Sequence, residues 1–109
     1  MAGFVKGDIV VIPFPFSDLT GSKKRPALVL ADLPGNDIIL CQITSQQSKD
    51  IYTVAIDSTH FVNGSLPVAS HIRTTRIFTA DKNIVIRRAG TLNQVVIDKV
   101  SKILVALLT

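Results

Sequence analysis

Cysteine and histidine are scarce in this chain of 109 residues. The single cysteine, Cys41, excludes a disulfide within the chain. It lies in the apolar run 38–43, where we expect a buried, unreactive thiol rather than a nucleophile. The two histidines, His60 and His71, are distant from Cys41, and this set lacks the spacing of a zinc site. The sequence therefore predicts no metal site and no cofactor.

Long apolar runs are also missing. Apolar residues make up 47% of the chain, but they come in short runs broken by proline, glycine, asparagine and aspartate. No run approaches the roughly 18 to 20 apolar residues that span a bilayer. Residues 1–8 lack the basic start, the apolar segment and the cleavage site of a signal peptide. We therefore expect a cytoplasmic protein that makes no use of a membrane.

Glutamate is absent, and all eight acidic residues are aspartates, most of them beside predicted turns or strand ends. Asp18 and Asp81 are candidates for catalysis, but a turn or capping role is favoured for each. Hydrolytic enzymes commonly use histidine, cysteine or paired carboxylates, and this chain offers little of that chemistry. Its twelve lysines and arginines give a net charge of +4, which favours an anionic partner.

The remaining pattern predicts one β-rich domain, residues 1–109. Short β-branched and apolar segments alternate with turn residues, and Pro13 and Pro15 indicate that the first strand is an edge strand or has a bent end. Residues 17–24 form a turn-rich loop, and residues 57–66 and 73–81 are not assigned to strands. The predicted strands are residues 8–16, 25–31, 38–43, 52–56, 67–72 and 83–87.

The C-terminal residues have a different period. Apolar residues from Leu92 to Leu107 recur at steps of three and four, as in an amphipathic helix. Residues 91–94, Thr-Leu-Asn-Gln, fit a capping box with Thr91 as the N-cap. The predicted fold class is mainly β with α: a small closed or half-closed barrel with a C-terminal amphipathic helix packed against it.

Two polar residues at strand ends are the first candidates for chemistry. Strands 25–31 and 38–43 can pair through the turn at residues 34–37, so residues whose numbers sum to about 70 face each other. Arg25 and Thr44 then lie at the same open end of the hairpin. The alternative is that both are ordinary surface residues at strand ends.

An arginine and a threonine suit one reaction well. RNA can be cleaved by its own 2′-hydroxyl, so the protein need only align the reacting atoms and stabilise charge on the phosphate oxygens. Arginine donates two hydrogen bonds to phosphate, and a hydroxyl adds another. A metal-free site of this kind acts on RNA and not on DNA, which has no 2′-hydroxyl.

Three segments carry a family resemblance. They are Lys6-Gly7-Asp8-Ile9-Val10, Lys24-Arg25-Pro26-Ala27-Leu28-Val29-Leu30 and Gln42-Ile43-Thr44-Ser45-Gln46. In this order, and followed by an amphipathic helix, they resemble the MazF/PemK family of toxins over nearly the whole chain. The resemblance implies an SH3-like barrel, a homodimer, and sequence-specific cleavage of single-stranded RNA that leaves a 2′,3′-cyclic phosphate and a 5′-hydroxyl. It also implies a cognate antitoxin whose flexible acidic and apolar tail covers the RNA-binding surface.

The resemblance also assigns roles to residues. It implies that Arg25 is the catalytic arginine, acting in proton transfer and phosphate stabilisation, and that Thr44 is the catalytic threonine. Arg73 matches an arginine of some members, Thr75 stands where some members have an acidic residue, and Arg76 could equally be a solvated loop residue. The predicted RNA-binding residues are Lys23, Lys24, Ser45, Gln46, Arg73, Thr75 and Arg76.

The loop before Arg25 departs from the family pattern. Gly21-Ser22 runs straight into Lys23-Lys24, whereas well-studied members have further residues before the Arg-Pro. That loop contacts RNA in the family, so the resemblance implies no base preference here.

Two other functions are compatible with such a fold. A related barrel serves toxins that bind DNA gyrase through the C-terminal helix, although the helix here ends without an aromatic anchor. A basic SH3-like module that binds RNA without cutting it is the second alternative.

Overall fold

The computed structural model describes residues 3–14, 23–47 and 50–109. Residues 15–22, which include the end of the first predicted strand and most of the loop before Arg25, lie outside them. The elements of the described residues are β1 (Asp8–Phe14), β2 (Lys23–Asp32), β3 (Asp37–Thr44), β4 (Thr53–Ile56), η1 (Ser58–His60), β5 (Phe61–Gly64), β6 (Ser70–Asp81), η2 (Lys82–Ile84), β7 (Arg87–Leu92) and α1 (Gln94–Leu108).

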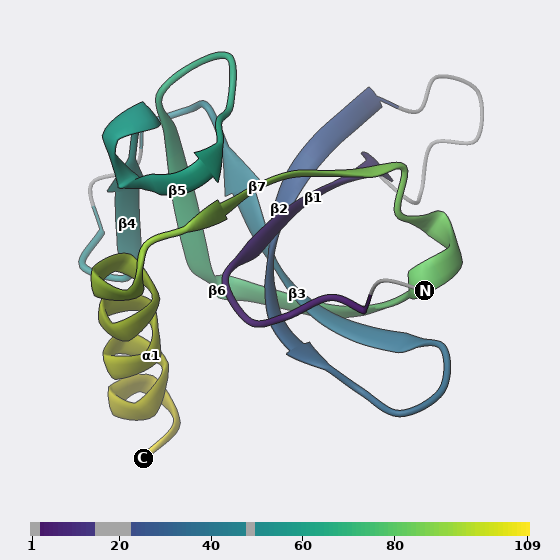
Figure 1. The fold of residues 1–109 in the computed structure, drawn as a ribbon. Helices are drawn as coiled ribbons and strands as arrows, with labels where there is room; N and C mark the ends of the chain where they lie inside the picture. The colour runs from purple at the N-terminus through teal and green to yellow at the C-terminus, as the bar shows by residue number, and fades with distance from the viewer. Residues whose placement is uncertain (1–2, 15–22, 48–49) are drawn as a thin grey trace.

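The strands form one sheet in the order β4-β6-β3-β2-β1-β7-β5. Every pair of neighbours is antiparallel, and the sheet curls into a half-barrel (Figure 1). α1 lies below β4 and β5 in this view. The predicted fold class, mainly β with a C-terminal helix, is confirmed.

β2 and β3 form the predicted hairpin. Near the turn Ala31 faces Ile39, but beyond a bulge at Leu30 the register changes, and Ala27 faces Gln42. A bulge inserts one unpaired residue into a strand. The numbers of paired residues therefore add up to 70 near the turn and to 69 toward the open end of the hairpin. The predicted register is therefore one residue off where Arg25 and Thr44 lie, and the two residues still share that end of the hairpin.

β1 lies in the interior of the sheet, between β2 and β7. Ile9 to Phe14 pair with β2, whereas only Asp8 to Val11 pair with β7. Pro13 follows the last residue that pairs with β7, so its missing N–H costs the sheet no hydrogen bond there. The predicted alternative of an edge strand is wrong, and the alternative of a bent end stays a prediction, since Pro15 lies outside the described residues.

Two apolar clusters pack on the sheet. The larger one includes Ile9, Leu28 and Ile43, and α1 covers it with Val96 and Val100. The smaller one gathers Val10, Ile12, Ala27, Val29, Ile38, Leu40 and Ala80, with Phe4, Phe78, Ile84 and Val85 against it. Burial on both faces explains why residues 27–29 and 40–41 are continuously apolar.

The helix begins differently from the prediction. Its N-cap is Asn93, whose side chain accepts a hydrogen bond from the Val96 N–H at 3.0 Å. Thr91 was the predicted N-cap, but its hydroxyl donates to Asp8 at 2.8 Å. Among the described residues, no helix is long and apolar enough to cross a membrane.

The region after residue 56 contains the other differences. Residues 57–66, predicted to be irregular, form η1 and β5, and Gly64 ends β5 with φ of +66°. The strand predicted at 67–72 begins at Ser70 and continues to Asp81, through the 73–81 segment. The strand predicted at 83–87 is wrong, because η2 occupies 82–84 and β7 begins only at Arg87.

Asp8 ties the N-terminal turn to β7. Its buried carboxylate accepts hydrogen bonds from the Val5 N–H at 3.0 Å and from Thr91, and it pairs with Arg88 at 3.0 Å. Arg88 also donates to the Gly3 carbonyl and lies over the Phe4 ring. A single carboxylate therefore holds the first residues, β1 and β7 together.

Replacing Asp8 with alanine should lower the free energy of unfolding by about 3 kcal/mol, because three donors lose a buried acceptor. Urea denaturation followed by circular dichroism measures the change. Asp98→Ala, which removes an exposed carboxylate bonded only by Gln94, is the control and should cost about 0.5 kcal/mol or less. Equal losses of unfolding free energy in the two variants would contradict the anchoring role of Asp8.

Candidate functional site

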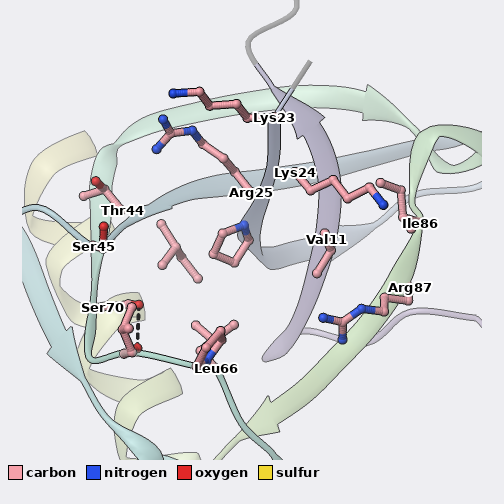
Figure 2. A pocket seen from close by; sticks show the side chains of 14 residues that line it. Val11, Lys23, Lys24, Arg25, Thr44, Ser45, Leu66, Ser70, Ile86 and Arg87 are labelled. Carbon is pink, nitrogen blue, oxygen red and sulfur yellow. Dashed lines mark hydrogen bonds between the residues drawn. The ribbon is translucent and has the colours of Figure 1, made fainter. Parts of the chain in front are cut away.

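A pocket of about 550 Å³ opens where the start of β2 and the end of β3 meet the start of β7 and the segment 65–69. Figure 2 shows its lining side chains converging from these separate parts of the chain. The lining residues are Val11, Lys23, Lys24, Arg25, Pro26, Ile43, Thr44, Ser45, Leu66, Pro67, Val68, Ser70, Ile86 and Arg87.

Arg25 enters the pocket from β2. Its backbone faces Ile12 of β1, and Pro26 next to it faces Val11. The side chain is half-buried, and its Nε has no hydrogen-bond partner among the described residues. A buried guanidinium N–H without an acceptor is unfavourable, so an anion in the pocket would satisfy it.

Thr44 lies at the end of β3, on the same side of the pocket as Arg25 (Figure 2). Only 7% of the residue is exposed. Its Oγ1 accepts a hydrogen bond from the Gln46 N–H at 3.1 Å, which fixes the oxygen beside the turn that follows β3. Because this bond uses an oxygen lone pair, the hydroxyl proton remains available to a ligand.

The charged residues that line the pocket are all cationic. Lys23 and Lys24 begin β2 and are exposed at one rim, and Arg87 begins β7 on the other. No aspartate or histidine is among the described lining residues. The walls between the cations are aliphatic, so the site combines positive charge with an apolar surface.

The structure brings together only part of the predicted site. Arg25, Thr44, Lys23, Lys24 and Ser45 line the pocket. The other predicted RNA-binding residues do not line it, and these are Gln46, Arg73, Thr75 and Arg76.

Residues 73–76 occupy a bend of β6. Ile72 pairs with Ile43 and Ile77 pairs with Cys41, so four residues of β6 lie opposite the single residue Gln42. Arg73 pairs with Thr53 of β4, while Thr75 and Arg76 are exposed. Their predicted part in RNA binding remains a prediction.

The sequence interpretation missed Arg87, Ser70 and the aliphatic wall of the pocket. Arg87 was placed at the end of a predicted strand, whereas it begins β7. The sequence gives little local signal for it, since Arg87 follows the apolar run 84–86 and precedes Arg88, Ala89 and Gly90. The pairing that sets Arg87 and Arg25 on two sides of one pocket is long-range and leaves no local pattern.

Asp81 and His60, which are candidates for catalysis or metal binding by residue type, have local roles. Asp81 caps η2 by accepting from the Asn83 N–H at 2.8 Å, as the favoured interpretation predicted, and Asp18 lies outside the described residues. His60 Nδ1 accepts from the Asp57 N–H at 2.9 Å. In residues 3–14, 23–47 and 50–109, no three histidine, cysteine or acidic side chains gather closely enough to hold a metal ion.

The model of the PemK-like, MazF-like toxins of type II toxin–antitoxin systems matches residues 5–108. No curated protein matches the chain in sequence.

Solved structures share the fold. The MazE–MazF complex (Form-II) from Deinococcus radiodurans superposes with a TM-score of 0.76 and 19% identity, covering 99% of this chain and 97% of that one. An endoribonuclease from a mycobacterial species gives 0.75 and 16%, over 99% and 93%. A mycobacterial endoribonuclease in complex with its cognate antitoxin gives 0.73 and 16%, over 95% and 93%. At these identities the likeness shows the fold alone.

Cys41 should be inert in the folded protein. Burial raises the pKa of its thiol to about 12, and Sγ donates to the Arg73 carbonyl at 2.8 Å. Because the thiolate is the reactive form, a thiol reagent such as Ellman's reagent should not label the native protein at a pH far below that value. Labelling should be complete after unfolding in guanidinium, and fast labelling of the native protein would contradict the prediction.

Proposed function

Because the chain belongs to the PemK-like, MazF-like toxins of type II toxin–antitoxin systems, we propose that it is an endoribonuclease that cleaves single-stranded RNA without a metal ion. The observation that carries the proposal is the shared pocket of Arg25 and Thr44. Two strand ends place a guanidinium and a hydroxyl in one cationic cavity, which is the donor set that a phosphodiester requires.

The reaction is an attack of RNA on itself. The 2′-oxygen bonds to the adjacent phosphorus, the bond from phosphorus to the 5′-oxygen breaks, and a 2′,3′-cyclic phosphate and a 5′-hydroxyl remain. The 2′-hydroxyl proton passes to water, and the leaving 5′-oxygen takes up a proton. The family resemblance gives Arg25 a part in this proton transfer.

The protein acts mainly through charge and alignment. Negative charge grows on the non-bridging oxygens as the 2′-oxygen attacks. The Arg25 guanidinium, whose Nε lacks a partner, donates to these oxygens, and Thr44 donates its free hydroxyl proton. DNA is not cleaved because it lacks the attacking hydroxyl.

The same pocket explains how an antitoxin would block the enzyme. Some of the similar structures contain a cognate antitoxin or MazE. An acidic and apolar tail fits a cavity whose charged lining residues are cations and whose remaining walls are mostly aliphatic. We propose that this chain has such a partner, that it is a homodimer, and that it acts in the cytoplasm.

Arg25→Ala should reduce the cleavage rate of a mixed-sequence single-stranded RNA by about 10²- to 10³-fold, and Thr44→Val by about 10²-fold, because each removes a donor to the developing charge. Gel electrophoresis of end-labelled RNA in excess chelator measures the rate. Lys102→Ala, which removes an exposed cation of α1 outside the pocket, is the control for net charge and should keep the wild-type rate.

Loss of wild-type cleavage in chelator would overturn the metal-free mechanism. RNA binding without cleavage would identify the chain as a binding module instead. If Arg25→Ala weakens binding and cleavage by the same factor, Arg25 serves affinity alone and is not catalytic.

A further inference from the structure

Arg87 is a cation of the pocket that the proposed cleavage step does not use. It reaches into the pocket from β7, across the cavity from Thr44 and Ser45 (Figure 2). Its side chain is exposed and makes no hydrogen bond or ion pair with any described residue. The side chain is therefore available to a ligand.

The side chain of the adjacent arginine, Arg88, has partners among the described residues, unlike that of Arg87. Arg88 pairs with Asp8, donates to the Gly3 carbonyl and packs over Phe4. Neighbouring residues of a strand point to opposite faces, so β7 gives one arginine to the N-terminal turn and the other to the pocket. Only Arg88 has a structural role in the described residues.

The sheet register fixes the separation of Arg87 from Arg25. Arg25 faces Ile12 of β1, and Arg87 faces Val11 from the other side of the same strand. Their backbones are thus two inter-strand spacings apart, roughly 10 Å. Two arginine side chains across such a gap can bind different phosphates of one RNA strand, but they are poorly placed to share a single phosphate.

An aliphatic wall lies beside Arg87. Ile86 and Val68 are 46% and 57% exposed although both line the pocket, and Leu66 and Pro67 continue the surface. Exposed apolar side chains in a cavity favour a flat apolar ligand, and a nucleobase next to a bound phosphate has that character.

We propose that Arg87 binds a second phosphate of the RNA strand, with the adjoining base packed on Leu66, Val68 and Ile86. The inference rests on the proposed function and adds to it a subsite beyond the scissile phosphate. Arg87 acts there as a binding residue. Its contribution depends on the length of the RNA, because a substrate too short to reach β7 gains nothing from it.

The test compares substrate lengths. The probes are 2′-O-methyl RNA, which cannot be cleaved, as a dinucleotide and as mixed-sequence oligonucleotides of about eight residues. Arg87→Ala should weaken binding of the longer probe about tenfold and leave dinucleotide binding unchanged. The slope of log affinity against log salt should fall by about 0.7, the value for one phosphate contact with a single strand.

Three variants sharpen the result. Arg87→Lys keeps the charge and should restore most of the salt slope, and Lys102→Ala, which removes an exposed cation of α1 outside the pocket, should match the wild type with both probes. Val68→Ser should weaken binding of the longer probe without changing its salt slope, because it removes apolar contact and no charge. Val68 is exposed, so this change should leave the fold intact.

The outcomes separate this inference from the proposed function. If the wild type cleaves RNA and Arg87→Ala binds the longer probe as the wild type does, the second subsite is wrong. An equal loss of affinity for both probes would place Arg87 at the same phosphate as Arg25 and would also overturn the second subsite. If the wild type does not cleave RNA, the proposed function fails, while the binding assay still reports on Arg87.

Discussion

The pairing of β1 on both of its sides is the constraint from which the site follows. β2 and β7 come from distant parts of the chain, and each is aligned by its hydrogen bonds to the same strand. That alignment sets Arg25 on one side of the cavity and Arg87 on the other. The Asp8 carboxylate strengthens it, because this side chain lies at the start of β1 and binds two residues of β7. The cationic cavity is thus a consequence of sheet register.

The chemistry of the cavity matches the demands of its proposed substrate. A reaction whose nucleophile belongs to RNA requires no activated side chain, and the described lining residues provide donors and positive charge instead. The Gln46 N–H orients Thr44, and the buried Nε of Arg25 has no competing partner within the described residues. The Thr44 hydroxyl is therefore oriented, and the Arg25 Nε unoccupied, before a phosphate arrives, which reduces the reorganisation that the reaction would otherwise need.

Local patterns could be predicted from the sequence, and long-range pairing could not. The turn at 34–37 and the two apolar runs beside it specify a hairpin, so the shared position of Arg25 and Thr44 was predictable. The bulge at Leu30 was not predictable, because nothing in the apolar run 27–31 distinguishes Leu30 from its neighbours. The strand character of residues 73–81 depends on pairing with β3 and β4, which outweighs their polar pattern. Thr91 has the right chemistry for an N-cap, but Asp8, far away in sequence, binds its hydroxyl.

The adjacent arginines of β7 also limit how the family can vary in this region. A shift of β7 by one residue along β1 would exchange the faces of Arg87 and Arg88. The guanidinium that anchors the N-terminal turn would then enter the cavity, and Asp8 would lose its partner. The segment from Lys82 to Ile86 is a surface connection, so it can change in length as long as the pairing with β1 and the Asp8–Arg88 ion pair keep β7 in register.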